Sequence, residues 1–439
     1  MTIDSRLERD LPRILADLAP ALYPDYIDDV LATTVRHHQR ASWTFPERWL
    51  PMAEILDIPM QRVLAPRIPW RLSSIAVATV ALLLGAVAVF IGAQPRLPAP
   101  FGLARNGVIA YDTDGDIYTA DPVTGIATAI VTGPTIDVGP RFSSDGTRVA
   151  FARMIDSGRA QLYVARSDGS DLRLLTPEPV TLVDSNLGRT VNPYQFSPDG
   201  RSVLIAASRG SFPVVSIAPI DGTGIRDLDL GMAAFEPSFR PPDGAEILFE
   251  GYQGSTRAGS GLFAYNLAGG TIRTIVAPSD LFDVGGPAWS PDGSQIVYQA
   301  YVHASADMAQ THVVSADGAR DLVLPSPPEA DWSQGSAWSN DGKRLFLHRG
   351  YAYAYDDVRA VVIPADGSSS GIEIRDNGAL AGGCCASWSW SPDDTQIVGT
   401  PVDASGQPMH QVIIDPQTGR SRPAPWTSTS DPTWQRLAP

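Results

Sequence analysis

The sequence has very little cysteine: two residues among 439, the adjacent Cys384 and Cys385. So low a number excludes a disulfide-rich scaffold and any zinc or iron–sulfur site built from four cysteines. Basic residues are also scarce, because 33 lysines and arginines face 48 acidic residues and leave a net charge of -15. Such a chain repels phosphate backbones, so we expect no nucleic-acid partner.

Glycine and proline, in contrast, are abundant. The chain has 39 glycines and 38 prolines, about a sixth of its length. Both residues interrupt helix interiors, which excludes a largely helical protein and favours many short strands separated by turns. A chain of 439 residues is also too long for one ordinary compact core, so we expect more than one folded unit.

One long apolar run stands out at residues 72–93, LSSIAVATVALLLGAVAVFIGA, which has no charged side chain. As a helix it would be about 33 Å long, enough to cross a hydrocarbon core of about 30 Å. A buried helix of a globular domain is the alternative, but such helices are usually shorter and have a polar face. A signal peptide fits less well, because a long polar segment precedes the run. We therefore predict a transmembrane helix over 72–93.

The flanking charges predict its orientation. Arg62, Arg67 and Arg71 crowd the amino-terminal side, whereas Arg96 and Arg105 lie further out on the other side. The positive-inside rule then places residues 1–71 in the cytoplasm of a single-pass cell-membrane protein. Residues 94–106 would be a linker, and 107–439 would form an extracytoplasmic domain.

The cytoplasmic piece is predicted to hold two short helices, over 7–18 and 26–35, each with apolar residues at spacings of three and four. Each helix would present one apolar face. The two faces either pack on each other or contact a cytoplasmic protein partner, and the sequence leaves both alternatives open.

The chain after residue 100 repeats a short pattern, an aromatic residue followed by Ser-x-Asp-Gly or a close variant. The aromatic positions are 43 to 54 residues apart: Phe142, Phe196, Phe239, Trp289, Trp338, Trp390 and, without the following turn, Trp434. An apolar stretch follows each turn, and seven later stretches end in Asp-Gly, Thr-Gly or Gly-Gly. Short β-rich stretches bounded by aspartate and glycine indicate strands and hairpin turns.

Four strands per period of this length are typical of one blade of a β-propeller. The first module, from Gly107, lacks an anchor strand, and the last anchor, Trp434, lacks the strands that should follow it. Pairing of the two chain ends would complete a seventh blade and leave no open sheet edge. We therefore predict an all-β fold, a seven-bladed propeller with six or eight blades as alternatives, preceded by the transmembrane helix and the small helical segment.

The pattern W/F-S-P-D-G, with alternating apolar residues and a later Asp-Gly, resembles the TolB-like and WD-repeat-like bacterial propellers over about residues 101–439. The resemblance implies the fold. Such propellers occur as periplasmic scaffolds, as domains of prolyl peptidases and as outer domains of membrane-anchored proteins. We expect no peptidase, because no second stretch is long enough for a hydrolase domain. The order of helices, span and outer domain resembles transmembrane anti-sigma factors, although residues 1–71 lack the cysteines of their zinc-binding motif.

In a propeller the short stereotyped turns lie on one rim, and the longer, irregular connections lie on the opposite rim. Function usually lies on irregular loops of a rigid scaffold, so we expect the binding face there. The candidate binding residues are Trp332, Tyr351, Tyr353, Tyr355, Asp356 and Asp357. Tyrosines stack on sugars or seat a peptide, and carboxylates attract cations. Alternatively, the tyrosines continue the flanking strands and pack between blades.

Three further patterns suggest chemistry. Residues 367–371 match G-x-S-x-G but have no helix after them, so we expect a hairpin turn. Asp112, Asp114 and Asp116 resemble the start of a calcium loop but lack its distal glutamate, which favours turn chemistry. Cys384 and Cys385 would form a vicinal disulfide outside the cell or remain two thiols, which alkylation and mass spectrometry distinguish. We assign no catalytic residue, metal or cofactor.

These expectations combine into one hypothesis for function. We expect a membrane-anchored propeller that binds an unknown protein or glycan outside, as a binding or sensor module, while residues 1–71 contact a cytoplasmic partner. One alternative is a hydrolase or lyase acting on cell-envelope or exogenous polymers. The other is a structural platform for assembly.

Overall fold

The computed structural model describes Thr79 and residues 101–438, with gaps at 183–193, 210–211, 253–258, 304–308, 328–329, 352–353, 375–387 and 404–406. At 182, 209, 212, 331–332, 334–336, 351 and 354–357 it describes the backbone alone. The chain divides into two units, Met1–Ala93 and Gln94–Pro439. The predicted cytoplasmic helices and, but for Thr79, the predicted span lie outside the described residues. Within the described ranges, no helix has the length and apolarity needed to cross a bilayer.

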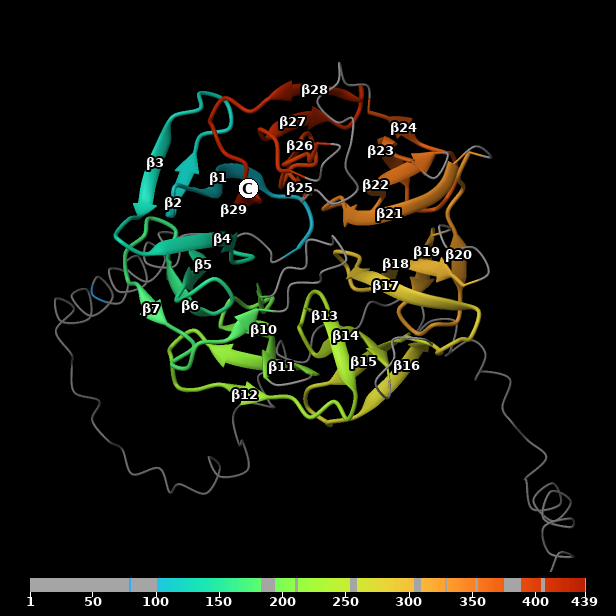
Figure 1. Cartoon of the computed structure of the whole chain (residues 1–439), viewed down its shortest axis with the longest axis horizontal. Helices are drawn as coiled ribbons and strands as arrows, with labels where there is room; N and C mark the ends of the chain where they lie inside the picture. The colour runs from blue at the N-terminus through green and yellow to red at the C-terminus, as the bar shows by residue number, and fades with distance from the viewer. Residues whose placement is uncertain are drawn as a thin grey trace, which may run out of the picture. The chain divides into compact units, whose positions relative to one another are not determined.

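Residues 101–438 form seven antiparallel sheets that follow one another around a ring (Figure 1). Blade 1 consists of β4 (Ile136–Phe142), β5 (Arg148–Met154), β6 (Ala160–Arg166) and β7 (Arg173–Leu174). Blade 2 consists of β8 (Thr181–Leu182), β9 (Tyr194–Phe196), β10 (Ser202–Arg209), β11 (Phe212–Pro219) and β12 (Arg226–Asp227). Blade 3 consists of β13 (Ala233–Phe239), β14 (Glu246–Tyr252), β15 (Gly261–Asn266) and β16 (Ile272–Val276).

The remaining four blades complete the ring. Blade 4 consists of β17 (Phe282–Trp289), β18 (Gln295–Val302), β19 (Ala309–Ser315) and β20 (Asp321–Val323). Blade 5 consists of β21 (Ala330–Trp338), β22 (Arg344–Tyr351), β23 (Ala354–Pro364) and β24 (Ile372–Glu373). Blade 6 consists of β25 (Trp388–Trp390), β26 (Ile397–Gly399), β27 (Val412–Asp415) and β28 (Arg420–Pro423). Blade 7 consists of β29 (Thr433–Leu437), β1 (Arg105–Thr113), β2 (Asp116–Ala120) and β3 (Ala127–Val131).

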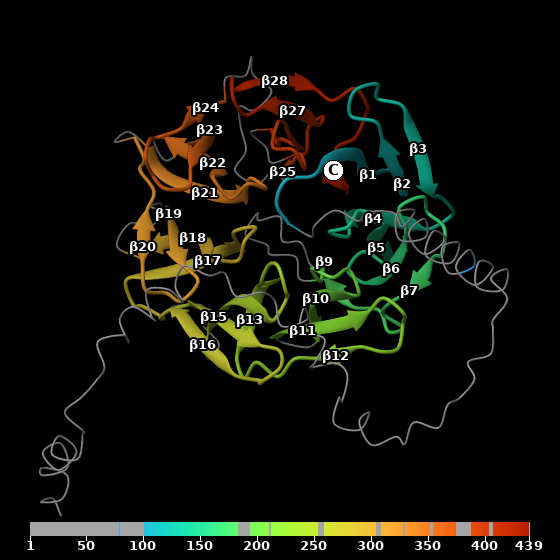
Figure 2. The same ribbon diagram turned by 180° about the vertical axis from the view of Figure 1, so that it is seen from behind.

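The two ends of the ring close as the sequence predicted. The last strand, β29, pairs antiparallel with the first strand, β1, with Trp434 opposite Ile109 and Thr433 opposite Ala110. Both ribbon views place β29 beside β1 near the centre of the ring (Figures 1 and 2). The all-β fold and the count of seven blades are therefore confirmed, and closure supplies blade 7 with its inner strand.

The repeated Ser-x-Asp-Gly pattern forms the turn between the first and second strand of a blade. In blade 1, the Ser143 hydroxyl donates to Asp145 Oδ1 at 2.5 Å, and the Gly146 amide donates to Ser143 O at 2.8 Å. The serine and aspartate satisfy each other and the turn backbone, which leaves these side chains little free bonding capacity. We call the rim that carries these turns the turn rim.

The repeated aromatic residue ends the inner strand and joins it to the preceding blade. The indoles of Trp338, Trp390 and Trp434 each donate to a backbone carbonyl of the previous inner strand, at 3.1, 2.9 and 3.2 Å. Buried aliphatic and aromatic side chains fill each seam between neighbouring blades. The core is thus a ring of inter-blade layers, and one tryptophan anchors each of these three seams.

The opposite rim, which we call the loop rim, carries the connections between second and third strands and those between blades. There Asp114 and Gly115, with φ of 54° and 86°, form a two-residue hairpin between β1 and β2, which agrees with the predicted turn.

Residues 367–371 lie between β23 and β24 in a hairpin connection, so the G-x-S-x-G letters are not a nucleophile elbow.

The polypeptide enters the propeller at the turn rim. The Ala104 amide donates to the carbonyl of Pro392 in the blade 6 turn, at 2.8 Å. Arg436, near the end of β29, donates to the Gly102 carbonyl at 2.6 Å. The entering segment and the last strand therefore meet on the same rim, away from the connections of the loop rim.

Candidate functional site

Several inner strands contain a bulge about midway along their length. The pairing of β4 with β5 shifts between Val138 and Arg141, and β13, β17 and β21 show the same shift at the equivalent place. In each case the inner strand has one residue more than its partner, which bends the strand and turns its backbone groups sideways. The bulges therefore present amides and carbonyls to the neighbouring blades.

The bulged residue has a left-handed backbone in three blades. It is Gly139 in blade 1 and Gly286 in blade 4, with φ of 65° and 61°, but it is Glu236 in blade 3, with φ of 49°. A non-glycine residue in this region costs about 1–2 kcal/mol. The carboxylate of Glu236 accepts the Gly286 amide at 2.6 Å and so joins blade 3 to blade 4.

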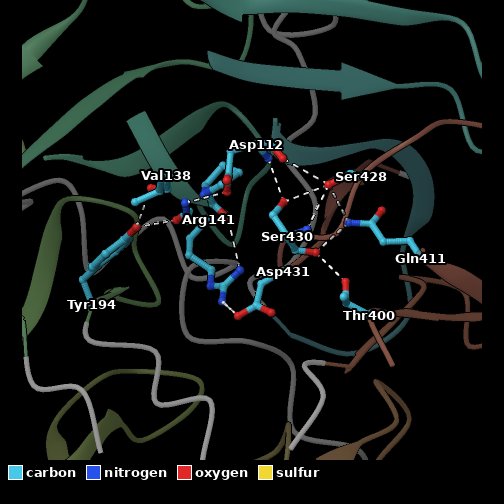
Figure 3. A network of polar contacts seen from close by, with 11 residues as sticks. Asp112, Val138, Arg141, Tyr194, Thr400, Gln411, Ser428, Ser430 and Asp431 are labelled. Atoms are coloured by element: carbon cyan, nitrogen blue, oxygen red, sulfur yellow. Dashed lines mark hydrogen bonds and ion pairs between the residues drawn. The ribbon is translucent and has the colours of Figure 1, made fainter. Parts of the chain in front are cut away.

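The bulge at Gly139 is held from both sides (Figure 3). Asp112 of β1 accepts the Gly139 amide at 2.9 Å, and the hydroxyl of Tyr194 in β9 donates to the Gly139 carbonyl. Tyr194 takes a position that proline occupies in several other blades, for example Pro237 and Pro287. Blades 7, 1 and 2 therefore meet at one backbone unit.

An ion pair lies next to this bulge. Arg141 Nη2 is 3.5 Å from Asp431 Oδ2, and the two side chains are 17% and 32% exposed. Arg141 Nη1 also donates to the Pro140 carbonyl at 3.2 Å. Arg141 belongs to blade 1 and Asp431 precedes the inner strand of blade 7, so the pair bridges two blades while remaining open to solvent.

Burial raises the pKa of Asp112 above its usual value, and the negative charge of Asp431 adds to this rise. Hydrogen bonds from the Gly139 amide and from Ser430 act against it. Burial also raises the pKa of Tyr194, which therefore stays a neutral hydroxyl donor. The site thus contains one arginine and two carboxyl groups, one of which accepts a proton more readily than a free aspartate does.

The backbone before Asp431 is fixed by hydroxyl and amide side chains of blades 6 and 7. The Asp112 amide donates to Ser430 Oγ at 2.9 Å, and Ser428 Oγ donates to the Asp112 carbonyl at 3.1 Å. Gln411 Nε2 donates to the Ser430 carbonyl at 2.7 Å, and the Thr400 hydroxyl donates to it as well. This network holds Asp431 in place, as expected for a preorganised site (Figure 3).

The residues predicted from the sequence lie in blade 5, at its loop-rim end. Trp332 belongs to β21, where it pairs with Gly350, and Tyr351 ends β22. Tyr355, Asp356 and Asp357 belong to β23. Their backbones thus lie in strands, and β23 begins at Ala354, soon after β22 ends at Tyr351, so they do not belong to a long irregular loop.

The side chains of these blade 5 residues lie outside the described part of the chain, as do all of Tyr353, Cys384 and Cys385. The candidate binding residues and the vicinal disulfide therefore stay predictions. The described ranges contain no three histidine, cysteine or acidic side chains that are close enough to hold a metal ion.

Sequence reasoning missed Asp112, Arg141 and Asp431 as a group, and it treated Asp112 as a turn residue alone. A signal does exist: counted from the repeated aromatic residue, Arg141 lies one position before Phe142 and Asp431 three positions before Trp434. Those positions are apolar or glycine in some other repeats, so charges there break the pattern. Asp112 becomes visible when β1 is aligned through the closure pairing with β29.

No family model matches the chain. Among solved structures, an oligogalacturonate lyase in complex with manganese is similar at 14% identity and a TM-score of 0.53, over 73% of this chain and 86% of the lyase. A prolyl endopeptidase is similar at 14% identity and a TM-score of 0.53, over 74% of this chain and 50% of that one. TolB from Acinetobacter baumannii matches at 15% identity and a TM-score of 0.44, over 74% and 81%. The first two similarities show the propeller fold.

Proposed function

We propose that this protein is a binding module that takes its ligand at the loop rim, over the Gly139 bulge. The observation that carries the proposal is the partly exposed ion pair of Arg141 and Asp431, beside Asp112, held by contacts from blades 6, 7, 1 and 2. The Ser-x-Asp-Gly turn of blade 1 offers no such group, because Ser143 and Asp145 bond each other and their own turn.

The charges of the site suggest the kind of ligand. An arginine and two carboxyl groups side by side favour a polar ligand that accepts and donates hydrogen bonds, such as a peptide segment or a glycan. The net charge of -15 acts against polyanions. The predicted aromatic residues of blade 5, Trp332 and Tyr351 among them, would add stacking surface on the same rim.

Co-purification with the full chain tests the binding function. Asp431→Ala and Arg141→Ala are expected to lose the partner or glycan that the wild type retains. Lys343→Ala is the matched control, because Lys343 is an exposed charge in the blade 5 turn of the turn rim. Retention by both loop-rim variants, or loss with Lys343→Ala alone, would contradict the proposal.

We also propose that residues 72–93 anchor the propeller in the membrane, with residues 1–71 in the cytoplasm and in contact with a partner there. The uncharged run and the arginines before it support this topology. Proteolysis of sealed inside-out vesicles should remove residues 1–71 and protect the propeller. Protection of both parts, or digestion of the propeller alone, would overturn the topology.

One observation favours an enzyme as the second candidate. The raised pKa of Asp112, which lies beside the carboxylate of Asp431, lets Asp112 hold a proton more readily than a free aspartate does, a property that acid–base catalysis uses. A hydrolase or lyase would shorten a polysaccharide. The first substrates to test are oligogalacturonate and a neutral cell-wall glycan. Oligogalacturonate is chosen because one structural neighbour is named an oligogalacturonate lyase. If the chain cleaves such a substrate and Asp112→Asn abolishes the cleavage, an enzyme is favoured over a binding module. If the chain neither binds nor cleaves, the structural platform for assembly is the reading that is left.

A further inference from the structure

A histidine on the loop rim lies between two acceptor oxygens. His303 directly follows β18, and its Nε2 is 2.9 Å from Asp283 Oδ2 while its Nδ1 is 2.8 Å from the Asp280 carbonyl. Its backbone amide donates to the Leu281 carbonyl at 2.9 Å. All three contacts join the end of β18 to the segment that leads into β17, the inner strand of blade 4.

The geometry decides the charge of this imidazole. A neutral imidazole has one N–H and one lone pair, whereas the imidazolium has two N–H donors. A backbone carbonyl accepts and never donates, and so does an ionised carboxylate. With His303 neutral, one ring nitrogen would turn its lone pair toward an oxygen less than 3 Å away, and one of the two bonds would become a repulsion. Both contacts are satisfied only when the ring carries two protons.

The carboxylate partner extends the contact to the neighbouring blade. Asp283 Oδ1 accepts the Gly259 amide at 2.8 Å and the Ser260 amide at 3.3 Å, immediately before β15 of blade 3. The Ser260 hydroxyl in turn donates to the Val284 carbonyl at 3.1 Å. Asp283 therefore joins His303 in blade 4 to the start of β15 in blade 3.

We propose that His303 is a protonation-controlled clamp at the loop rim, closed when its imidazole carries two protons and released when it loses one. Among the described residues, the charged groups that face it are Asp280, just before β17, and Asp283, within β17. The described residues of blade 3 contribute the amides of Gly259 and Ser260 and a hydroxyl, which carry no charge. The clamp needs no ligand, so it holds or fails independently of the proposed binding function.

Two facts support the direction of the switch. The hydrogen bond to Asp283, and then the Asp280 carbonyl, raise the pKa of His303 above its ordinary value of 6.5. A pKa that is higher in the folded than in the unfolded protein stabilises the fold fully below the unfolded value, and the contribution is lost as pH rises through the folded pKa. The clamp is therefore closed in mildly acidic surroundings and opens as the pH becomes alkaline.

Blade 1 supplies an internal comparison. There the fully buried carboxylate of Asp137 is held by Arg153, whose Nε and Nη2 donate to its two oxygens at 2.7 and 2.9 Å. Arginine stays charged at every physiological pH, so this inner-strand clamp does not titrate through its cation. The carboxylate of Asp283 in blade 4 is held by a histidine, whereas that of Asp137 in blade 1 is held by an arginine, so of these two contacts only the one in blade 4 titrates through its cation.

Nuclear magnetic resonance on the full chain in micelles, with labelled histidine, measures the protonation directly. The chain has only six histidines, and His303→Gln assigns the signal of interest by its disappearance. We expect two ring N–H protons on His303 at about pH 6, and a titration midpoint above that of a free histidine. A single neutral tautomer at about pH 6 would overturn the proposal.

Hydrogen exchange then measures the mechanical consequence. His303→Arg keeps a cation at every pH, so it is the matched closed variant. Exchange in peptides covering 279–284 and 300–303 should be equal in wild type and variant at about pH 6, and several-fold faster in the wild type at about pH 8.5. The peptides around Asp137 and Arg153 should show no difference at either pH. Equal exchange in the 279–284 peptides at both pH values would refute the clamp, and if His303→Arg does not fold, the wild-type titration alone decides.

Discussion

Replacing Gly139 with alanine probes the bulge on which the candidate site is built. Gly139 has φ of 65°, and an added Cβ would lie 2.8 Å from the hydroxyl oxygen of Tyr194, closer than such contacts occur. Gly286 is the matched position in blade 4, with φ of 61°, but there the nearest atom to an added Cβ is Gln299 Cγ at 3.6 Å. The two substitutions therefore share the backbone cost and differ in the clash.

The magnitudes follow from these two contributions. An alanine in the left-handed region costs about 1–2 kcal/mol, and both variants should lose this much stability. Overpacking against a fixed neighbour adds about 1–3 kcal/mol, and Gly139→Ala alone should lose it. We expect Gly286→Ala to destabilise by about 1.5 kcal/mol and Gly139→Ala by about 3 kcal/mol.

The clash can be removed separately. The next nearest atom of Tyr194 is its Cζ, 3.8 Å from the added Cβ, so Tyr194→Phe leaves room for the methyl group. Tyr194→Phe alone should cost about 1 kcal/mol for the lost hydrogen bonds to the bulge. In the Tyr194→Phe background, Gly139→Ala should cost only about as much as Gly286→Ala does in the wild type.

Urea unfolding followed by tryptophan fluorescence measures all four variants, since the chain has 10 tryptophans. Two results would refute the reasoning. One is an equal loss of stability for Gly139→Ala and Gly286→Ala. The other is additivity of Gly139→Ala with Tyr194→Phe, because a relieved clash requires a non-additive cycle.

Three further outcomes are expected from the same unfolding assay. Trp434→Phe should cost about 1 kcal/mol more than Trp289→Phe, because both remove a buried indole, whereas the Trp434 indole donates a hydrogen bond and the Trp289 indole meets no acceptor among the described residues. Asp137→Asn breaks the buried pair with Arg153 and should cost about 3 kcal/mol or more. Burial lowers the pKa of His348 to about 4, so stability should fall by about 3 kcal/mol between pH 6.5 and 4, and His348→Gln should flatten that slope.

The propeller was predictable from the sequence because its repeated element is local. An aromatic residue, the serine–aspartate turn and the following apolar stretch form contacts within a few residues, as the Ser143 to Asp145 bond shows. The closure of the ring followed from counting: an incomplete first module and an isolated Trp434 need each other, and β29 does pair with β1.

The candidate site was less accessible to sequence reasoning, because its members come together only through long-range geometry. Asp112 and Gly139 are bonded because β4 packs beside β1 of the neighbouring blade and the bulge turns the Gly139 amide toward it, whereas ring closure brings Asp431 to Arg141. A bulge leaves a weak trace in a sequence: glycine marks it at Gly286, yet Glu236 takes the same place in blade 3. Pattern reading therefore chose aromatic residues on the loop rim, which stay a prediction, and overlooked the charged pair.

Two histidines in adjacent blades make the propeller respond to pH in opposite senses. His348 is enclosed in blade 5 against the rings of Phe346 and Trp388, and burial lowers its pKa. The unfolded chain therefore binds a proton at His348 more readily than the folded one, and the free energy of unfolding falls in acid. His303 in blade 4 needs its second proton, so alkali releases the end of β18. Both demands are met only above the pKa of His348 and below that of His303. A substitution that removes the titration of one histidine should therefore widen this pH range on one side only: His348→Gln on the acid side and His303→Arg on the alkaline side. A pH profile of each variant would reveal this.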